Sequence, residues 1–302
     1  MNKKYKNIRI TTNTNNSEAV SGVIGYLLNP DGIEETDIDG HRVCIKAYIS
    51  YDEKTSDQHI KELIHDNLHN IDYDLDIVDF DYDPSIETEW KKYFKPRKVG
   101  KHFVIKPSWE EYEENKGEIV VTIDPGTAFG TGLHETTRGV IVLLEEIIEE
   151  RSQKTDNIKN LHLLDAGTGS GILAIAAYKM GIRDILAIDN DKEAVDTAKE
   201  NILANNIQRG INTEHTTLEK LTDNNYYDIA LANIIPDVLI NSKRTLKDML
   251  KYEADLVLSG ILEKEEKRVI EEFSAIDGLK LFKKIQLEEW STLWFKLDHS
   301  KD

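Results

Sequence analysis

The sequence is poor in several features that mark particular classes of protein. It has 302 residues with one cysteine and six prolines, and no apolar run approaches the roughly 20 residues that a membrane span needs. The lone Cys44 has no disulfide partner within the chain and no neighbours with the spacing of metal ligands. The N-terminal segment MNKKYKNIRITTNTNN is basic and then polar, without the apolar stretch of a secretory signal. We therefore expect a cytoplasmic protein with no membrane span and no metal site.

Basic residues are also scarce. The chain has 38 lysines and arginines against 56 aspartates and glutamates, which gives a formal net charge of −18. Because an acidic chain is repelled by a phosphate backbone, extended nucleic-acid binding is not expected. The exception is segment 91–106, which holds seven lysines and arginines and no acidic residue. A basic protein partner suits the acidic surface better, and the alternative is that the acidity serves only solubility.

The apolar pattern separates an N-terminal region from the rest of the chain. Residues 1–90 follow the order strand, helix, strand, helix, strand, which predicts a small α+β domain. The last strand, at 71–83, alternates apolar and acidic residues, as expected for an edge strand guarded against aggregation or for a surface that binds a basic partner. Residues 91–118 contain Pro96 and Gly100 and are expected to form a basic linker between domains. Its lysines could dock onto acidic faces on either side.

The remainder, residues 119–302, alternates strands with helices, which is the pattern of a parallel sheet covered on both faces. Two strands without a helix between them, at 279–290 and 291–297, end the chain. The expected fold is α/β: a doubly wound, Rossmann-like sheet closed by a C-terminal antiparallel hairpin, together with the small N-terminal α+β domain.

The segment LLDAGTGSGILAIAA carries the strongest signal for a ligand. A buried strand runs into Asp165, then into Gly167, Gly169 and Gly171, and then into a helix. Glycines allow the backbone to turn sharply and to approach a ligand beside the positive end of the helix. Asp189 ends the next strand, 22 positions after Gly167, where a carboxylate can accept both hydroxyls of a ribose. A nucleoside site explains this pattern better than a purely structural turn does.

The spacing of the glycines helps to choose the nucleoside. Dinucleotide sites use G-x-G-x-x-G, whose glycines admit a pyrophosphate, whereas this turn is G-x-G-x-G and follows an acid, Asp165, that would repel phosphate. S-adenosylmethionine has an adenosine, an ammonium and a sulfonium but no phosphate, so the same acid attracts it. The pattern (V/L)LDxGxGxG and the terminal hairpin resemble class I S-adenosylmethionine-dependent methyltransferases. We expect Asp165 and the three glycines to form part of the cofactor site.

A third element, LANIIPD at 231–237, resembles the Asn-x-x-Pro motif of methyltransferases that act on nitrogen. An amine attacks the methyl group in line, so its lone pair must be aimed while its hydrogens are held. The side-chain oxygen of Asn233 and the carbonyl of Ile234 are acceptors suited to this task, and we expect both to be catalytic. The alternative is that Asn233 caps a turn and that Pro236 opens the next helix.

A second glycine-rich stretch, DPGTAFGTGLHETT at 124–137, lies outside the nucleoside turn. It resembles the signature loop of the ribosomal protein L11 methyltransferase family, usually close to DPGxAFGTGxHPTT. Further segments follow the family's order, namely EWKKYF, KPSWEE, LLDAGTGSGILAIAA, LANI, LSGIL and EEWSTLWFKL. The resemblance runs from roughly residue 87 to the C-terminus, and residues 1–86 match only in length and pattern. Glu135 replaces the usual proline, and an acid at a helix start is favourable in its own right.

The resemblance implies an enzyme that methylates ribosomal protein L11 at lysine side chains and at the N-terminal α-amine. It implies that the N-terminal domain binds this substrate and swings on the linker. Cofactor contacts are implied for Thr137, Gly167, Asp189 and Asn233. A loop over the methionine end of the cofactor, which would exclude water, is implied for Phe129, Gly130, Thr131 and Gly132.

Two other functions fit parts of the pattern. One is N-methylation of a nucleic-acid base, which predicts salt-sensitive RNA binding and is disfavoured by the acidic charge. The other is a non-catalytic protein that retains the fold and binds S-adenosylmethionine. We assign no general base, because no histidine pair stands out and a lone His134 beside a helix start is expected to pack or to cap the helix.

Overall fold

The computed structural model describes residues 4–28, 30, 32–51, 56–68, 71–80, 95–124, 134–154 and 157–298. The chain forms two compact units, Met1–Tyr93 and Phe94–Asp302. Within the described residues, none of the helices has the length and apolar character to cross a membrane. The same residues contain no cluster of three or more His, Cys, Asp or Glu side chains that could hold a metal ion.

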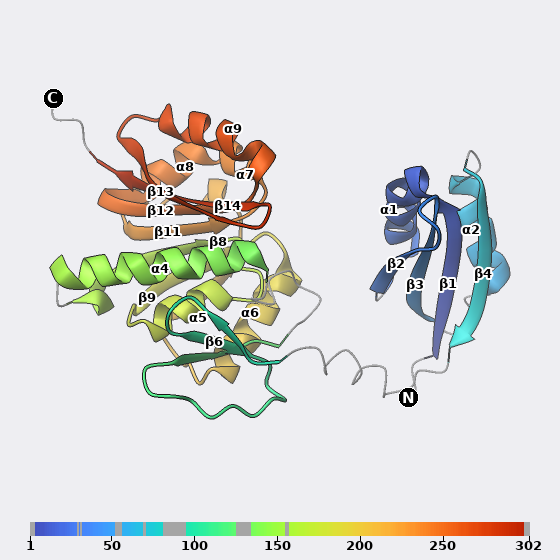
Figure 1. Cartoon of the computed structure of the whole chain (residues 1–302), viewed down its shortest axis with the longest axis horizontal. Helices are drawn as coiled ribbons and strands as arrows, with labels where there is room; N and C mark the ends of the chain where they lie inside the picture. Colours follow the sequence, from blue (N-terminus) through green and yellow to red (C-terminus); the bar gives the residue numbers. More distant parts are fainter. Residues whose placement is uncertain are drawn as a thin grey trace. The chain divides into compact units, whose positions relative to one another are not determined.

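The first unit is a four-stranded antiparallel sheet with two helices (Figure 1). The strands follow the order β2-β3-β1-β4. Its elements are, in chain order, β1 (Lys4–Asn13), η1 (Thr14–Asn16), α1 (Ser17–Leu28), β2 (Gly32–Asp37), β3 (Arg42–Tyr51), α2 (Asp57–Asn67) and β4 (Tyr73–Phe80). Strand β2 is not predicted from the sequence, because GIEETD has a single large apolar side chain and lies at the edge of the sheet.

Apolar side chains from the sheet and from both helices form the core of this unit. Ile8, Ile10 and Ile45 of the sheet pack with Ile24 of α1 and Ile60 of α2, and all five are buried. Both helices therefore cover the same face of the sheet.

The acidic strand β4 lies at the edge of this sheet. Asp74 and Asp76 are exposed, whereas Leu75 and Ile77 pack against the core. The alternation predicted for 71–83 is thus confirmed in β4. Charged side chains on an edge strand discourage pairing with another chain.

A seven-stranded sheet forms the centre of the second unit, in the order β10-β9-β8-β11-β12-β14-β13. Neighbouring strands are parallel from β10 to β12, and β14 runs antiparallel to β12 and β13. This confirms the doubly wound sheet and its C-terminal antiparallel hairpin. The elements of the unit are, in chain order, β5 (Arg97–Val99), β6 (Phe103–Lys106), β7 (Ile119–Thr122), α4 (Glu135–Lys154), η3 (Ile158–Asn160), β8 (His162–Ala166), α5 (Ile172–Lys179), β9 (Asp184–Asp189), α6 (Lys192–Ala204), β10 (Ile211–His215), η4 (Leu218–Lys220), β11 (Tyr227–Asn233), α7 (Pro236–Asn241), α8 (Lys243–Met249), β12 (Leu250–Leu262), α9 (Glu263–Ser274), β13 (Leu279–Leu287) and β14 (Trp290–Leu297).

Alternate residues of the central strands face opposite layers of helices. Leu163 of β8 and Leu231 of β11 pack in the core that contains α4 and α5, whereas Leu164 and Ala232 pack in the core that contains α7, α8 and α9. Figure 1 shows α4 on one side of the sheet and α7 to α9 on the other. Because both faces are covered, these strands are nearly continuous apolar runs, HLLDA in β8 and YDIALAN in β11.

Two strands differ from the sequence prediction. The strand predicted at the start of residues 119–302 is β7, which belongs to a separate three-stranded sheet, β5-β6-β7, and not to the main one. Strand β10 was not predicted. It is the edge strand of the main sheet, and its sequence INTEH is largely polar.

The predicted linker at 91–118 also differs from the structure. Phe94 already belongs to the second unit, and both β5 and β6 fall within the predicted linker. Buried Glu145 of α4 holds the β5–β6 turn by accepting from the backbone N–H groups of Lys101 at 2.7 Å and His102 at 2.8 Å. The lysines of this segment do dock onto acidic side chains of the second unit, in the ion pairs Lys95–Glu110, Lys98–Glu118 and Lys101–Glu149.

Candidate active site

The turn between β8 and α5 depends on glycine backbone conformations. Gly167, Gly169 and Gly171 have φ values of +74°, +53° and +81°, which residues with a Cβ rarely adopt. The N–H groups of Gly167 and Thr168 both donate to the carbonyl of Ile188 at 2.9 Å. The turn is therefore fixed beside the end of β9.

Asp189, the last residue of β9, is oriented by two backbone donors. Its Oδ2 accepts from the N–H of Gly169 at 2.9 Å, and its Oδ1 accepts from the N–H of Asp191 at 3.0 Å. A carboxylate offers about four lone-pair sites, so each oxygen keeps capacity for a further hydrogen bond. This is the arrangement that a ribose diol requires.

Asp165 lies beneath the glycine turn. Its side chain is fully buried, and its Oδ2 accepts from the Thr168 hydroxyl at 2.7 Å and from the N–H of Ala174 at 3.2 Å. Burial, and to a smaller extent the Asp189 carboxylate, raise the pKa of Asp165 to about 6, against the two hydrogen bonds, which lower it. Asp165 thus ties the turn to the first turn of α5.

A cavity of about 760 Å³ opens at the carboxyl ends of the parallel strands, within the usual size range of ligand sites. This is the edge where the chain runs from β8 to one side of the sheet and returns at β11, the switch point at which such sheets bind ligands. The cavity wall includes six of the residues that were assigned to the site from the sequence: Thr137, Gly167, Gly169, Asp189, Asn233 and Ile234. Asp165 and Gly171 are not on the wall, and Phe129, Gly130, Thr131 and Gly132 lie outside the described residues.

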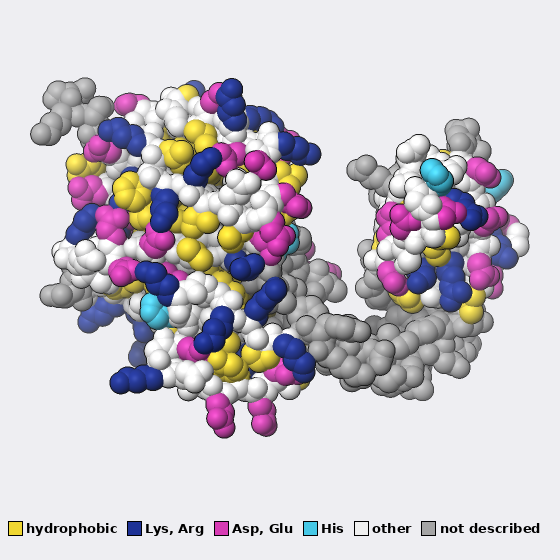
Figure 2. Space-filling model, viewed as in Figure 1, with side chains coloured by type: hydrophobic (Ala, Val, Ile, Leu, Met, Phe, Trp, Pro, Cys, Tyr) yellow, Lys and Arg dark blue, Asp and Glu magenta, His cyan; other side chains and the backbone are white. Residues whose placement is uncertain are grey.

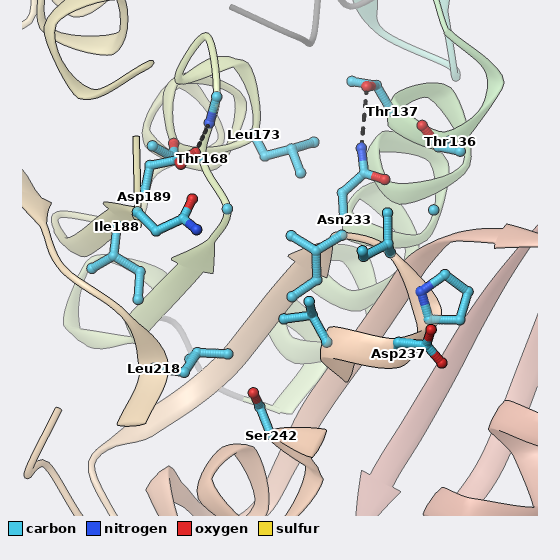
Figure 3. A pocket seen from close by; sticks show the side chains of 18 of the residues that line it. Thr136, Thr137, Thr168, Leu173, Ile188, Asp189, Leu218, Asn233, Asp237 and Ser242 are labelled. Atoms are coloured by element: carbon cyan, nitrogen blue, oxygen red, sulfur yellow. Dashed lines mark hydrogen bonds between the residues drawn. The ribbon is translucent and has the colours of Figure 1, made fainter. Parts of the chain in front are cut away.

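Asn233, at the end of β11, and Thr137, in the first turn of α4, point toward one another (Figure 3). The Asn233 Nδ2 donates to the Thr137 Oγ1 at 3.4 Å. This bond turns the amide nitrogen toward Thr137 and leaves the side-chain oxygen, which is the acceptor of the amide, available to a ligand. Pro236 opens α7, as the capping alternative expects, but the N-cap residue is Ile235 and no side chain caps this helix. The structure therefore gives Asn233 no capping role at α7.

His134 supports the start of α4. Its Nδ1 accepts from the N–H of Thr136 at 3.3 Å and lies 2.8 Å from the Thr136 hydroxyl. The ring packs edge-on against Trp290, with centroids 4.8 Å apart. The packing and capping role expected for this histidine is confirmed, and both rings line the cavity.

Asn201 of α6 joins the two glycine-rich stretches. Its Oδ1 accepts from the N–H of Asp124 at 3.2 Å, and its Nδ2 donates to the carbonyl of Ser170 at 2.9 Å. Asn205, the C-cap residue of α6, pairs with the backbone of Thr122 in β7, accepting at 3.0 Å and donating at 2.6 Å. Both asparagine side chains are buried. Of the two, only Asn201 reaches the nucleoside turn through these bonds.

One part of the cavity wall follows β10 and was not predicted from the sequence; it is formed by Thr216, Thr217, Leu218 and Glu219. The N–H of Thr216 donates to the carbonyl of Asp189 at 2.9 Å, which places this segment beside the end of β9. A usable signal was the length of the segment that connects α6 to β11 in the sequence. The segment 205–226 is longer than an ordinary connection within a compact domain, and this length indicates that it contains a further strand.

A model of the protein family described as "Ribosomal protein L11 methyltransferase (PrmA)" matches residues 4–298. The chain belongs to the ribosomal protein L11 methyltransferase family. The match includes the first unit, where the sequence motifs alone carried no specific resemblance. S-adenosylmethionine is the cofactor that this family and fold imply, as the glycine turn predicts.

Relatives named ribosomal protein L11 methyltransferase match the chain over different lengths. One from Ruminiclostridium cellulolyticum is 32% identical over 325 residues, covering 97% of this chain and 98% of the relative. One from Geotalea uraniireducens is 42% identical over 212 residues, covering 69% of this chain and 66% of the relative, which is just under two thirds of that protein. The crystal structure of a ribosomal protein L11 methylase from Lactobacillus delbrueckii subsp. bulgaricus aligns with a TM-score of 0.59 at 29% identity, covering 68% of this chain and all of that one.

Proposed function

We propose that this protein transfers methyl groups from S-adenosylmethionine to amino groups of ribosomal protein L11, at lysine side chains and at the N-terminal α-amine. The observation that carries the proposal is that one cavity contains both a carboxylate for a ribose and a pair of acceptors for an amine. These are Asp189 on one side and Asn233 with Ile234 on the other. The chain that holds them belongs to the L11 methyltransferase family.

The residues of the cavity fit the cofactor. Asp189 retains acceptor sites for ribose hydroxyls, and the apolar side chains of Ile188 and Leu218 lie near it on the same wall, where they offer a surface for adenine (Figure 3). The Asp165 carboxylate beneath the turn favours a cationic ligand through its charge without touching it. When bound, the cofactor supplies a methyl group made electrophilic by a positive sulfur.

Asn233 and Ile234 are proposed to aim the amine. A lysine has an ordinary pKa of about 10.4, and only its neutral form has a lone pair to attack with. The Asn233 side-chain oxygen and the Ile234 carbonyl would accept the two N–H groups of that neutral amine, which leaves the lone pair directed at the methyl group. Thr137 holds the Asn233 amide in the orientation that this requires.

We propose that the first unit recognises the protein substrate. Residues 1–90 contain 19 acidic against 8 basic residues, and Asp74 and Asp76 are exposed on the edge strand. Such a surface complements a basic partner and speeds its association. A cytoplasmic location is part of the proposal, because a ribosomal protein substrate would be met there.

The distribution of basic residues in the second unit favours a protein substrate over a nucleic acid. Three lysines of the segment 95–106 form ion pairs with glutamates of the same unit. On the face shown in Figure 2, basic and acidic side chains of this unit are interspersed. A nucleic-acid site would instead concentrate basic side chains along one path.

The proposal is tested by incubating the protein with labelled S-adenosylmethionine and a mixture of purified ribosomal proteins and ribosomal RNA, followed by mass spectrometry. We expect label on L11, at lysines and at the N-terminal amine. Label confined to RNA would support a base methyltransferase instead. Titration calorimetry with S-adenosylmethionine covers the third possibility, because binding without transfer to any substrate would indicate a non-catalytic protein.

A further inference from the structure

Strand β12 contains a bulge beside the cavity. Its parallel pairing with β11 ends at Asn233 and Ser259. Its antiparallel pairing with β14 shifts register between Leu258 and Ile261. Gly260 lies within this irregularity, has a φ of +82° and lines the cavity. A glycine with positive φ is typical of one kind of bulge, and bulges near active sites redirect the groups around them.

Gly260 lies directly against the backbone of Ile234. A Cβ at position 260 would be 2.6 Å from the Ile234 carbonyl oxygen, 3.0 Å from its carbonyl carbon and 3.2 Å from its nitrogen. These are backbone atoms, so they cannot move away by a change of rotamer. On the other side, the Ile234 side chain fills the space that a Cβ at Gly167 would need. Ile234 is therefore confined between two glycines, one from the cofactor turn and one from β12.

We propose that Gly260 is a positioning residue for methyl transfer. Its missing side chain allows the Ile234 carbonyl to lie where it accepts a hydrogen bond from the incoming amine. The inference rests on the aiming role proposed above for Asn233 and Ile234, and adds the residue that fixes one of those acceptors in place.

The expected size of the effect follows from the contact distance. Ordinary van der Waals contacts of a Cβ begin at 3.4 Å, so a Cβ only 2.6 Å from the Ile234 oxygen forces a displacement of about 0.8 Å. A misplacement of about 1 Å in a reacting geometry costs on the order of 10²-fold in rate. The nucleoside end of the cavity, at Asp189, is built from β9 and the glycine turn and has no contact of this kind with Gly260. A change at Gly260 should therefore lower kcat and leave cofactor affinity nearly unchanged.

Gly278 provides a matched control in the same chain. It also has a φ of +82°, and a Cβ there would also be 2.6 Å from a backbone oxygen, that of Asp298. It precedes β13 and is absent from the cavity wall. Replacement of either glycine by alanine thus imposes the same backbone strain and the same kind of clash, and only one of the clashes involves Ile234.

The experiment compares Gly260→Ala and Gly278→Ala in the full chain, together with Asn233→Ala as a test of the aiming role itself. Thermal unfolding, the S-adenosylmethionine Kd by calorimetry and kcat with ribosomal protein L11 are measured for each. We expect both glycine variants to lose a similar few degrees in Tm. We expect Gly260→Ala alone to lose about 10- to 100-fold in kcat, with its Kd within about threefold of the wild-type value.

The outcomes separate the inference from the proposal on which it depends. If Asn233→Ala retains kcat, the aiming role is wrong and the role of Gly260 is lost with it. If Asn233→Ala loses kcat but Gly260→Ala retains it, only the positioning role of Gly260 is contradicted. Equal losses of kcat in the two glycine variants contradict it as well. The positioning role is also contradicted if Gly260→Ala fails to fold while Gly278→Ala folds. The contact between Gly260 and Ile234 would then be needed for folding and not for orienting the amine.

Discussion

Replacement of Asn201 by alanine tests whether the cofactor site depends on the connection between the two glycine-rich stretches. The change removes two hydrogen bonds, one to the N–H of Asp124 at 3.2 Å and one to the carbonyl of Ser170 at 2.9 Å. At about 1 kcal/mol for each bond, the connection contributes about 2 kcal/mol. If all of this contribution is coupled to cofactor binding, its loss corresponds to a factor of about 30 in Kd. We expect an increase in Kd of about 5- to 30-fold.

Asn205→Ala is the control, because it removes more hydrogen bonds at the end of the same helix and none of them reaches the glycine turn. Its side chain bonds to the N–H and the carbonyl of Thr122 and to the carbonyl of Asn201, three bonds in all. By the same estimate it should lose about 3 kcal/mol of stability, more than Asn201→Ala loses. Because none of its bonds reaches the residues of the turn, its cofactor Kd should stay within about twofold.

The assay pairs calorimetric titration with S-adenosylmethionine and urea unfolding of both variants. The expected result is a crossed pattern, in which the less destabilised variant binds the cofactor more weakly. If instead the loss of affinity follows the loss of stability in both variants, Asn201 acts on the fold as a whole. An unchanged Kd in Asn201→Ala would refute the connection outright.

Two further changes address the site itself. Asn233→Ala should keep the cofactor Kd within a few-fold while kcat falls by about 10²-fold; equal losses in calorimetry and in steady-state kinetics would remove its aiming role. Asp165→Asn tests the buried charge. Burial raises the folded-state pKa of Asp165 to about 6 from 3.8, so the native state holds this proton more tightly than the unfolded state. The contribution of Asp165 to stability is therefore present below pH 3.8 and is lost as pH rises through 6. The Asn variant, which carries no charge, should be more stable than the wild type by up to about 3 kcal/mol at pH 7.5, and urea unfolding should show this advantage shrinking toward pH 4. An advantage independent of pH would contradict the shifted titration.

The sequence predicts buried elements better than exposed ones. Strands β8 and β11 are covered by helices on both faces, so HLLDA and YDIALAN are nearly continuous apolar runs. Strands β2 and β10 lie at sheet edges and are largely polar, and neither was predicted. For edge strands, backbone pairing with a neighbour compensates for weak side-chain patterning, and a single sequence does not reveal that neighbour.

The basic segment shows a second limit of sequence analysis. Its lysines and Gly100 indicated a linker, yet it is held to α4 by Glu145, whose bonds to the backbone of Lys101 and His102 span 44 and 43 positions. Local composition cannot reveal an acceptor that far along the chain.

At the site, spacing predicts which residues end the strands but not where every side chain points. Asp189 and Asn233 line the cavity because each is the last residue of a parallel strand, at the carboxyl edge where the cavity opens. Asp165 stands one residue before the end of β8, and its carboxylate turns beneath the glycines to bond Thr168 and Ala174. The motif is compatible with an Asp165 side chain that points into the cavity or with one that points beneath the turn. The hydrogen bonds to Thr168 and Ala174 show that it points beneath the turn.

Gly260 and Asn201 affect the site indirectly, through contacts with the backbone of other residues. In the sequence, LSGIL carries only a family resemblance, and Asn201 carries no signal. In the structure, Gly260 lies against the backbone of Ile234, and Asn201 bonds the glycine turn at Ser170. If they control separate steps, the double variant should show the kcat of one and the Kd of the other, because changes at independent sites add. Coupling between them would mean that displacement of Ile234 is transmitted through its contact with Gly167, so that the amine and the cofactor are positioned by one shared piece of backbone.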